Sequence, residues 1–260
     1  MYLASCCQAG DLTALRGYCA QAGVTATQIR EVRALSLACA NGHLEVARWL
    51  QQTFPYTAED KLELNRSLHM ACMNDHLEVA RWLHQTFPYT AEDARAKDNQ
   101  ALRMACANGR LEVARWLQQA FQLTAVDARI ENNWALHMAC ANGHLEVARW
   151  LQQTFELTAD DARAYRNYAL QMACANGHLE IARWLHQTFQ LTVVDAHAVA
   201  KYALYGACAG GHLEVARWLH QTFQLTVVDA HAAINYALCG ACVGGHLEIA
   251  RWVQQTFQLT

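Results

Sequence analysis

A motif of about 34 residues recurs along the chain and limits its fold more than any other feature. A cysteine marks the same place in each copy, and successive cysteines are 33 residues apart once and 34 residues apart five times: Cys39, Cys72, Cys106, Cys140, Cys174, Cys208 and Cys242. A period of this length indicates a repeat array. Each repeat of such an array buries its faces against its neighbours, so a stack is expected rather than one core around one cleft.

Each copy is predicted to contain two helices joined by a turn. The first helix ends at a glycine such as Gly143, which suits the left-handed conformation of a helix end, although Asp75 takes this place in the second copy. The second helix, for example residues 145–155, carries apolar side chains over more than half of its circumference. Such a wide apolar arc needs neighbours on several sides, as a stack of repeats supplies.

A short third helix is predicted after the second one. It follows a Thr-x-x-Asp motif, in which threonine is a good N-cap and the acidic residue completes a capping box; the threonines are Thr57, Thr90, Thr124, Thr158, Thr192 and Thr226. We expect this helix to end near Arg166 in its copy. The asparagines that follow are predicted to cap the next first helix; they are Asn99, Asn133, Asn167 and Asn235.

The two ends of the array differ in sequence. Gln8 to Arg16 align with Ala40 to Arg48, so we expect residues 1–34 to form a diverged N-terminal capping repeat and residues 35–260 to form seven repeats in one continuous solenoid. The last copy lacks such polar divergence. We therefore expect self-association through the C-terminal repeat, with an exposed apolar surface made of Val243, Ile249, Trp252, Val253 and Phe257.

Composition narrows the classes of partner and the compartment. The formal net charge is −3, and no run of Lys or Arg could follow a phosphate backbone, which argues against nucleic acid. No apolar run approaches the ~18 residues of a membrane span, which argues against a membrane. Eleven cysteines, most of them at one repeat position, do not form a disulfide framework. We expect a soluble protein of a reducing compartment, the cytoplasm or else the nucleus.

Candidate chemistry is weak. Cys239 and Cys242 form a lone Cys-x-x-Cys pair without the second pair of ligands that zinc needs. The alternation of histidine and glutamine at His84, His186 and His220 indicates a solvent-facing position. No nucleophile with a base and no phosphate-binding loop is found, so we predict no enzyme, no metal and no cofactor. A ladder of seven tryptophans could stack on bases or sugars, but packing against the adjoining repeat is the preferred interpretation.

Two sets of positions vary between copies where the rest of the repeat is constant, and they are the candidate partner-binding residues. The first lies two positions before a constant alanine and comprises Ser36, His69, Arg103, His137, Gln171 and Tyr205. The second lies between the third helix and the next first helix and comprises Lys97, Asp98, Glu131, Asn132, Tyr165 and Arg166. Freedom from packing explains this variation as well as a binding face does, and both interpretations stay open here.

The stretch from Ala135 to Val147 reads ALHMACANGHLEV and resembles the ankyrin repeat. That family's pattern is Thr-Pro-Leu-His-x-Ala followed by Gly-His-x-Glu-Val, and it is matched from Leu136 onward. The Thr-Pro is missing, Phe155 stands where the family has a glycine, and the Thr-x-x-Asp helix replaces the projecting β-hairpin. The Ala-Arg-Trp-Leu and Thr-Phe-x-Leu-Thr phrases are similar to the divergent ankyrin arrays of large DNA viruses and protists.

The resemblance implies an all-α, ankyrin-like α-solenoid of helix-turn-helix repeats with few or no β fingers. It also implies a structural hydrogen bond made by the histidine after each turn. The expected function is that of a non-catalytic scaffold for protein–protein interaction, with a partner that the sequence does not identify. The alternatives are a targeting arm, or adaptor, for an activity on another chain, and an RNA or carbohydrate reader that uses the tryptophans.

Overall fold

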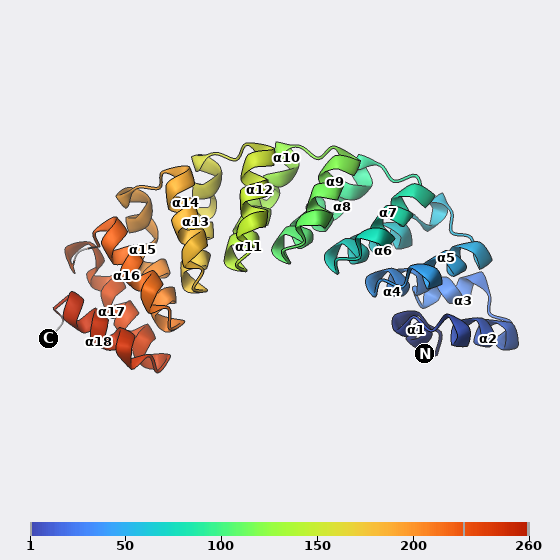
Figure 1. Cartoon of the computed structure of the whole chain (residues 1–260), viewed down its shortest axis with the longest axis horizontal. Helices are drawn as coiled ribbons and strands as arrows, with labels where there is room; N and C mark the ends of the chain where they lie inside the picture. The colour runs from blue at the N-terminus through green and yellow to red at the C-terminus, as the bar shows by residue number, and fades with distance from the viewer. Residues whose placement is uncertain (1, 226, 259–260) are drawn as a thin grey trace. The chain divides into compact units, whose positions relative to one another are not determined.

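The computed structural model of the chain describes residues 2–225 and 227–258, except for the side chains of residues 193–194, 196–201 and 227–233. Every regular element within these residues is a helix (Figure 1), so the β-hairpin is absent from them, as predicted. The chain falls into two compact units, Met1–Asp127 and Ala128–Thr260, which we call unit 1 and unit 2.

The helices follow the three-helix order expected of each copy. Those of unit 1 are α1 (Tyr2–Ala9), α2 (Leu12–Ala22), α3 (Ala26–Glu31), α4 (Ala34–Ala40), α5 (Leu44–Thr53), the 3₁₀ helix η1 (Ala58–Asp60), α6 (Lys61–Met73), α7 (Leu77–Thr86), α8 (Ala91–Ala107), α9 (Leu111–Phe121) and the short α10 (Ala125–Ala128), which ends one residue beyond it. Those of unit 2 are α11 (Ile130–Ala141), α12 (Leu145–Phe155), α13 (Ala159–Ala175), α14 (Leu179–Phe189), α15 (Val193–Ala209), α16 (Leu213–Phe223), α17 (Val227–Val243) and α18 (Leu247–Thr256).

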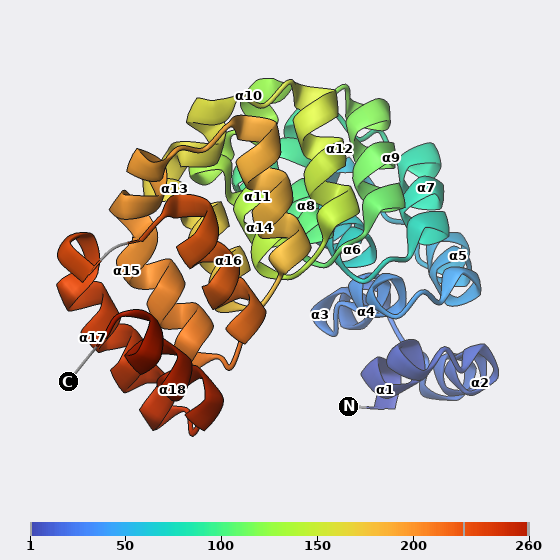
Figure 2. The same ribbon diagram turned by 60° about the vertical axis from the view of Figure 1, so that its left-hand side comes forward.

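Within each unit the helices form two layers (Figures 1 and 2). The first helices stack on one another, α4 on α6 and α6 on α8 in unit 1, and α11 through α13 and α15 to α17 in unit 2. The second helices form the other layer, each against the first helix of its own repeat. Small side chains let the first helices approach closely: a Cβ on Gly206 of α15 would lie 2.5 Å from the Cβ of Ala175 on α13.

The recurring cysteine is a small core residue of the first helix. Each thiol from Cys39 to Cys208 is buried, whereas Cys242 in the last copy is exposed. Burial raises the pKa of these thiols, to about 12 for Cys208. They are therefore protonated at neutral pH and act as small apolar groups, as predicted from their repeat position.

The tryptophans pack on neighbouring rings rather than forming an open ladder. Trp116 is half-buried and lies edge-on to Phe121 at 5.9 Å between ring centroids. His84 of the preceding repeat contacts the same two rings, and the equivalent His186 and His220 do so in unit 2. The prediction that these histidines face solvent is wrong. They are half-buried, and Nδ1 of His220 also lies 3.1 Å from the Leu225 carbonyl oxygen.

The turn between the two helices of a repeat is joined to the preceding repeat by its histidine. Nε2 of His76 lies 3.1 Å from the Ala40 carbonyl oxygen, and His43, His178 and His246 make the same contact with Gln8, Ala141 and Ala209. This is the structural hydrogen bond that the resemblance implies. The ring also covers the glycine of the preceding turn, where a Cβ on Gly42 would lie 2.6 Å from Nδ1 of His76.

Asp75 shows how one repeat tolerates the loss of that glycine. It has a φ of 69°, in the left-handed region, as predicted from its position. The residue that would cover it in the next repeat is Arg110 instead of histidine, and its Nη1 lies 3.3 Å from the Asp75 carboxylate. The two exceptions to the motif are therefore coupled, because a longer, flexible side chain leaves room for a Cβ that a histidine ring would not.

We expect Arg110→His to lower the free energy of unfolding by about 1–2 kcal/mol in the natural chain, because the new ring collides with the Asp75 side chain. The same substitution should have little effect in the Asp75→Gly background, which restores the usual glycine–histidine pair. Urea denaturation of the four proteins measures this coupling as a double-mutant cycle. Equal effects of Arg110→His in the two backgrounds would contradict it.

The apolar surface expected in the last repeat is smaller than predicted. Ile249, Val253 and Phe257 are buried and Trp252 is half-buried, because these side chains turn toward the rest of their own unit. Val243 is exposed as expected, and the neighbouring Leu247 is exposed as well. Self-association through the C-terminal repeat stays a prediction, now with Val243 and Leu247 as its apolar contacts.

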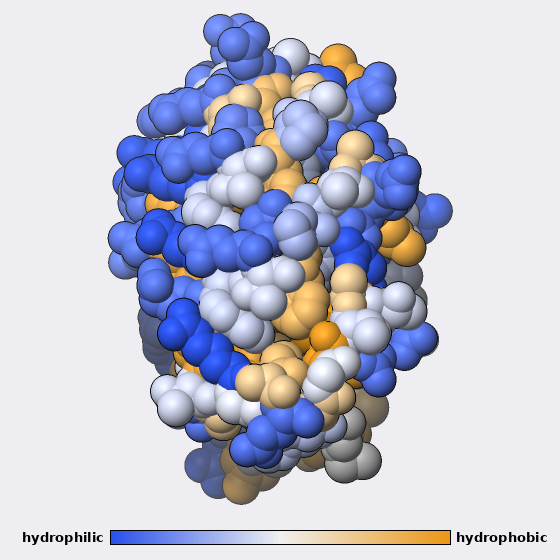
Figure 3. Space-filling model, turned by 90° about the vertical axis from the view of Figure 1, so that its right-hand side faces the viewer, coloured by the Kyte–Doolittle hydropathy of each residue, from blue (hydrophilic) through white to orange (hydrophobic). Residues whose placement is uncertain are grey.

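The surface of unit 1 seen in Figure 3 is largely hydrophilic, and its hydrophobic residues lie in narrow strips between charged and polar ones. Glu45 and Arg48 on α5 are typical of the outer positions of the second helices, exposed and 3.7 Å apart. None of the helices in the described part of the chain is both long and apolar enough to cross a membrane.

Candidate partner-binding surface

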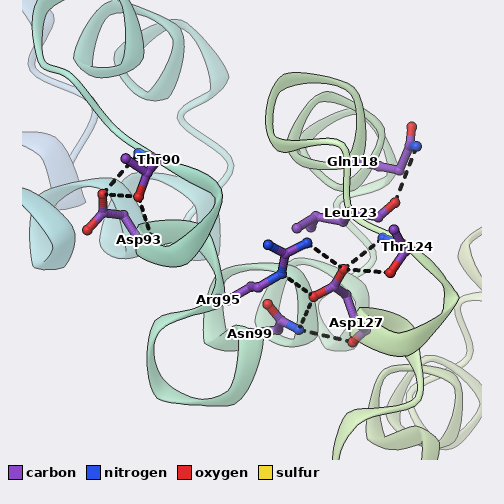
Figure 4. Close-up of polar contacts among 8 residues, drawn as sticks. All are labelled: Thr90, Asp93, Arg95, Asn99, Gln118, Leu123, Thr124 and Asp127. Atoms are coloured by element: carbon purple, nitrogen blue, oxygen red, sulfur yellow. Dashed lines mark hydrogen bonds and ion pairs between the residues drawn. The ribbon is translucent and has the colours of Figure 1, made fainter.

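Four third helices in the described part of the chain begin with the predicted capping box. In α8 the backbone N–H of Thr90 donates to Asp93 at 2.9 Å and the backbone N–H of Asp93 donates to the Thr90 hydroxyl at 3.4 Å (Figure 4). Thr57, Thr158 and Thr192 form the same box, and both the N–H and hydroxyl of Thr124 donate to Asp127. The box is confirmed at Thr57, Thr90, Thr158 and Thr192, Thr124 shows only the contacts that it donates to Asp127, and Thr226 lies outside the described residues.

The capping aspartate also receives a bidentate ion pair from the preceding repeat, which the sequence pattern did not reveal. Nε and Nη2 of Arg95 donate to Asp127 at 2.7 and 3.1 Å (Figure 4). The same pairing joins Arg30 to Asp60, Arg129 to Asp161 and Arg163 to Asp195, and Lys61 takes the arginine's place beside Asp93. The signal was present as a recurring Asp-Ala-Arg triplet at residues 93–95, 127–129 and 161–163.

These contacts hold the capping carboxylates in their ionised form. Burial works to raise the pKa of Asp127, but hydrogen bonds from Arg95, the Thr124 backbone and Asn99 outweigh it and lower the pKa to about 2. Asp93, Asp161 and Asp195 have pKa values lowered to about 2 in similar surroundings. Each repeat boundary of this kind is therefore held by a full negative charge at neutral pH.

The asparagines predicted as N-caps have a different role. A capping side chain accepts a hydrogen bond from the helix, whereas Asn99 donates through Nδ2 to the carbonyl and carboxylate oxygens of Asp127, both at 3.2 Å (Figure 4). Nδ2 of Asn167 donates to the Asp195 carbonyl oxygen at 3.3 Å. The fourth asparagine, Asn235, lies inside α17. The capping prediction is wrong because Oδ1 of Asn99, Asn133 and Asn167, the atom that would accept from the helix, is buried without a hydrogen-bond partner.

A turn of three left-handed residues joins each third helix to the next first helix in α8, α11 and α13. The residues are Lys97, Asp98 and Asn99, then Glu131, Asn132 and Asn133, then Tyr165, Arg166 and Asn167, with φ between 50° and 64°. The third helix of α13 thus ends before Ala164 rather than near Arg166. In every turn the asparagine is buried while the two residues before it are exposed.

The exposed pairs of these turns are candidate site residues identified from the sequence. Lys97 with Asp98, Glu131 with Asn132, and Tyr165 with Arg166 project from the same place in successive repeats. Left-handed geometry is costly for a side chain other than glycine or asparagine, by roughly 1–2 kcal/mol per residue. The buried asparagine and its aspartate hold the turn in place, so the exposed pair is free to vary in chemistry without altering the backbone.

The other candidate column does not form one surface. Ser36, His69 and His137 are buried, so the expectation that this column is exposed is wrong for these three, and their contact with a partner stays a prediction. The Ser36 hydroxyl lies 3.2 Å from that of Ser67, and its backbone N–H donates to Glu63. Burial lowers the pKa of His69, and it lowers the pKa of His137 to about 4, so both rings are neutral at pH 7.

The remaining members of that column lie closer to the surface. Nη2 of Arg103 donates to the Lys97 carbonyl oxygen at 3.2 Å, and Nε2 of Gln171 donates to the Arg166 carbonyl oxygen at 2.5 Å. Both side chains are half-buried, and each hydrogen-bonds to a carbonyl oxygen of the left-handed turn that precedes it in the chain. Tyr205 is 42% exposed and is the member of this column best placed to contact a partner.

A further variable column was missed by the sequence analysis. It lies five residues before the constant alanine, and its members are exposed or half-buried: Arg33, Arg66, Gln100, Trp134, Tyr168, Tyr202 and Tyr236. The column is cationic at the start of unit 1 and aromatic throughout unit 2. Tracking chemical type as well as variability along the copies would have identified it.

Comparison with known proteins supports the interpretation of the repeats. A family model described as ankyrin repeats (3 copies) matches four overlapping segments, residues 3–91, 35–127, 68–161 and 102–195. No curated protein matches the chain. Ankyrin repeats are generally modules of protein–protein interaction and typically non-enzymatic scaffolds. With a family model covering most of its length and a helix-turn-helix stack in both units, the chain belongs to the ankyrin-repeat family.

Proposed function

We propose that this protein is a non-catalytic scaffold that binds a protein partner through the exposed residues of its left-handed turns and of the adjoining variable column. The observation that carries the proposal is the contrast within each turn. The asparagine is buried in all three turns and in two of them donates to the next repeat's aspartate, while the exposed pair changes from Lys-Asp to Glu-Asn to Tyr-Arg. A constant frame that presents changing side chains is what selective recognition of a partner requires.

The chemistry of the exposed residues supports a protein partner. Tyr165 is 68% exposed, and Tyr202, Tyr205 and Tyr236 in the same unit are each about half exposed. Tyrosine and arginine are enriched in the contacts of protein interfaces, because they combine a large packing surface with polar groups. Backbone strain at the turns supports a functional role as well, since strained conformations persist where function uses them.

The tryptophans do not support a reader of RNA or carbohydrate. The seven tryptophans of the second helices are half-buried, and each lies edge-on to the phenylalanine five residues after it. A stacking platform needs an open ring face for each base or sugar. The non-catalytic part of the proposal is supported by the protonated state of the buried column thiols, whose raised pKa values make them poor nucleophiles.

The test exchanges turn residues for ones that this chain already places in the same geometry. The variant Lys97→Glu, Asp98→Asn, Tyr165→Glu and Arg166→Asn gives all three turns the Glu-Asn pair of α11. We expect an unchanged helical circular-dichroism signal and unfolding midpoint, with at least a tenfold loss in the amount of partner captured from an extract of the source cells. Quantitative mass spectrometry of the captured proteins measures that loss.

The matched control carries Glu112→Gln, Arg115→Gln, Glu180→Gln and Arg183→Gln, four substitutions of exposed residues on the second helices. It should capture the partner as the natural chain does. Undiminished capture by the turn variant, or an equal loss with the control, would overturn the assignment of the partner to the turns.

A further inference from the structure

Unit 1 contains a groove that lies apart from the contacts between repeats described above. It has a volume of about 510 Å³ and lies between the link from α3 to α4, the start of α6 and the left-handed turn of α8. Its lining includes Arg33, Leu62, Arg66, His69 and Lys97. Two of these, Arg33 and Arg66, are the cationic members of the variable column that precedes the first helices.

The charges in the groove are unevenly matched. Arg30 and Asp60 neutralise each other through a bidentate contact, and the Glu63 carboxylate accepts a hydrogen bond from the Ser36 N–H. Arg33, Arg66 and Lys97 are exposed and have no ion pair within the described residues. Four cations and three carboxylates line the groove in all, so its net charge is positive; the members outside any ion pair of the described residues include Arg33, Arg66 and Lys97 together with one carboxylate, Glu59.

The floor of the groove carries an unsatisfied polar atom. His69 is 7% exposed, and its buried Nε2 has no hydrogen-bond partner. A buried polar nitrogen without a partner costs about 1–3 kcal/mol. Because His69 is one of the residues that line the groove, a ligand group seated there could supply that hydrogen bond.

The rim of the groove carries an unusual apolar residue. Leu62 is 82% exposed and lies among the charged residues of the groove's edge. An exposed leucine alone is ordinary, but its place beside unpaired cations suits a ligand that alternates acidic and aliphatic side chains. Such a ligand covers the leucine and neutralises the cations at once.

We propose that this groove binds a short acidic segment of a partner protein, with a carboxylate at Arg33, Arg66 and Lys97, an aliphatic side chain on Leu62 and a polar group at Nε2 of His69. The inference rests on the proposed function in taking the partner to be a protein, and it names the chemistry of the segment. A nucleic acid fits less well, because a phosphate backbone needs a continuous track of cations and Glu59, Asp60 and Glu63 interrupt the cations of this groove, whereas a short segment can place a single carboxylate among them.

The test uses the purified full chain and fluorescein-labelled peptides of alternating Glu-Leu or Gln-Leu, followed by fluorescence anisotropy. We expect the Glu-Leu peptide to bind at least tenfold more tightly than the Gln-Leu peptide. Arg33→Glu with Arg66→Glu should abolish that preference without changing the unfolding midpoint, because both side chains are exposed and unpaired. The control, Arg48→Glu with Arg81→Glu, reverses two exposed arginines on α5 and α7 and should retain it.

Equal affinity for the two peptides, or equal loss in the control, would overturn the proposal. Tighter binding of a fluorescein-labelled oligouridine than of the Glu-Leu peptide would also overturn it and assign the groove to nucleic acid. The Arg33 and Arg66 variant lies apart from the four positions changed in the turn variant. If it captures the cellular partner normally while the turn variant does not, the proposed function stands and the groove assignment fails.

Discussion

Asp161→Ala is expected to lower the free energy of unfolding by about 3 kcal/mol, because it removes a buried carboxylate and leaves its donors without an acceptor. Asp161 is 7% exposed and accepts from Nε and Nη2 of Arg129 at 2.7 and 3.0 Å and from the N–H and hydroxyl of Thr158 at 2.8 and 3.1 Å. Arg129 itself is 40% exposed, which keeps the loss below that of a fully buried pair. Urea denaturation followed by circular dichroism measures it.

The preceding residue supplies a matched control. Asp160 is an acid in the same helical turn, but its side chain is 98% exposed and lies 3.9 Å from Arg163. Asp160→Ala should change the unfolding free energy by less than about 0.5 kcal/mol. Similar losses for the two variants would mean that the ion pair between repeats contributes no more than a surface charge.

Lowering the pH should remove the difference in unfolding free energy between the natural chain and Asp161→Ala. Burial works to raise the pKa of Asp161, but Arg129 and Thr158 lower it from 3.8 to about 2 in the folded chain. A folded-state pKa below the unfolded one stabilises the protein above pH 3.8, and this contribution is lost as the pH falls through 2. The two proteins should therefore converge in stability toward pH 2.

Gly42→Ala is expected to lower the free energy of unfolding by about 2–3 kcal/mol. The substitution forces alanine into a φ of 76° and places its Cβ 2.6 Å from Nδ1 of His76, which must then leave its hydrogen bond with Ala40. Unfolding midpoints in urea would show the loss.

Gly245→Ala separates the cost of the left-handed backbone conformation from the cost of the clash with histidine. Gly245 occupies the same place in the last repeat with a φ of 75°, but a Cβ there meets nothing within 4 Å. Only the backbone cost of about 1 kcal/mol remains. Should both alanine variants lose the same amount of stability, the contact with the next repeat's histidine would be irrelevant to it.

Local features of the fold were predictable because they depend on a few neighbouring residues. The turn glycines and the capping boxes follow from backbone geometry and short-range hydrogen bonds, and the buried cysteines follow from their recurrence at one position of an apolar helix face. The sequence analysis missed contacts between residues 32 positions apart, such as Arg95 with Asp127, because arginine on a helix is ordinarily a solvated residue. Their recurrence one repeat apart was the available clue.

The candidate site was predicted in part for the same reason. The pairs at the left-handed turns are exposed because the buried asparagine fixes which way the backbone turns. The column of Ser36, His69 and His137 varies although it is buried, since each copy satisfies that position differently: a serine pair in one, and imidazole rings in others. Variation between copies therefore indicates freedom of chemistry, and exposure has to be established separately.

The ion pair between repeats has a consequence for how such a protein changes in length. Within the described residues, four of these ion pairs join an arginine near the end of one copy to the aspartate that caps the third helix of the next copy, and a lysine replaces the arginine in a fifth. A copy duplicated or removed in frame would restore the ion pair on both sides without any compensating substitution. The exposed pairs of the turns can thus be exchanged or multiplied together with whole repeats. Asp75 and Arg110 are an exception, because each of these two residues is compatible with the other and the two copies that carry them would have to be moved together.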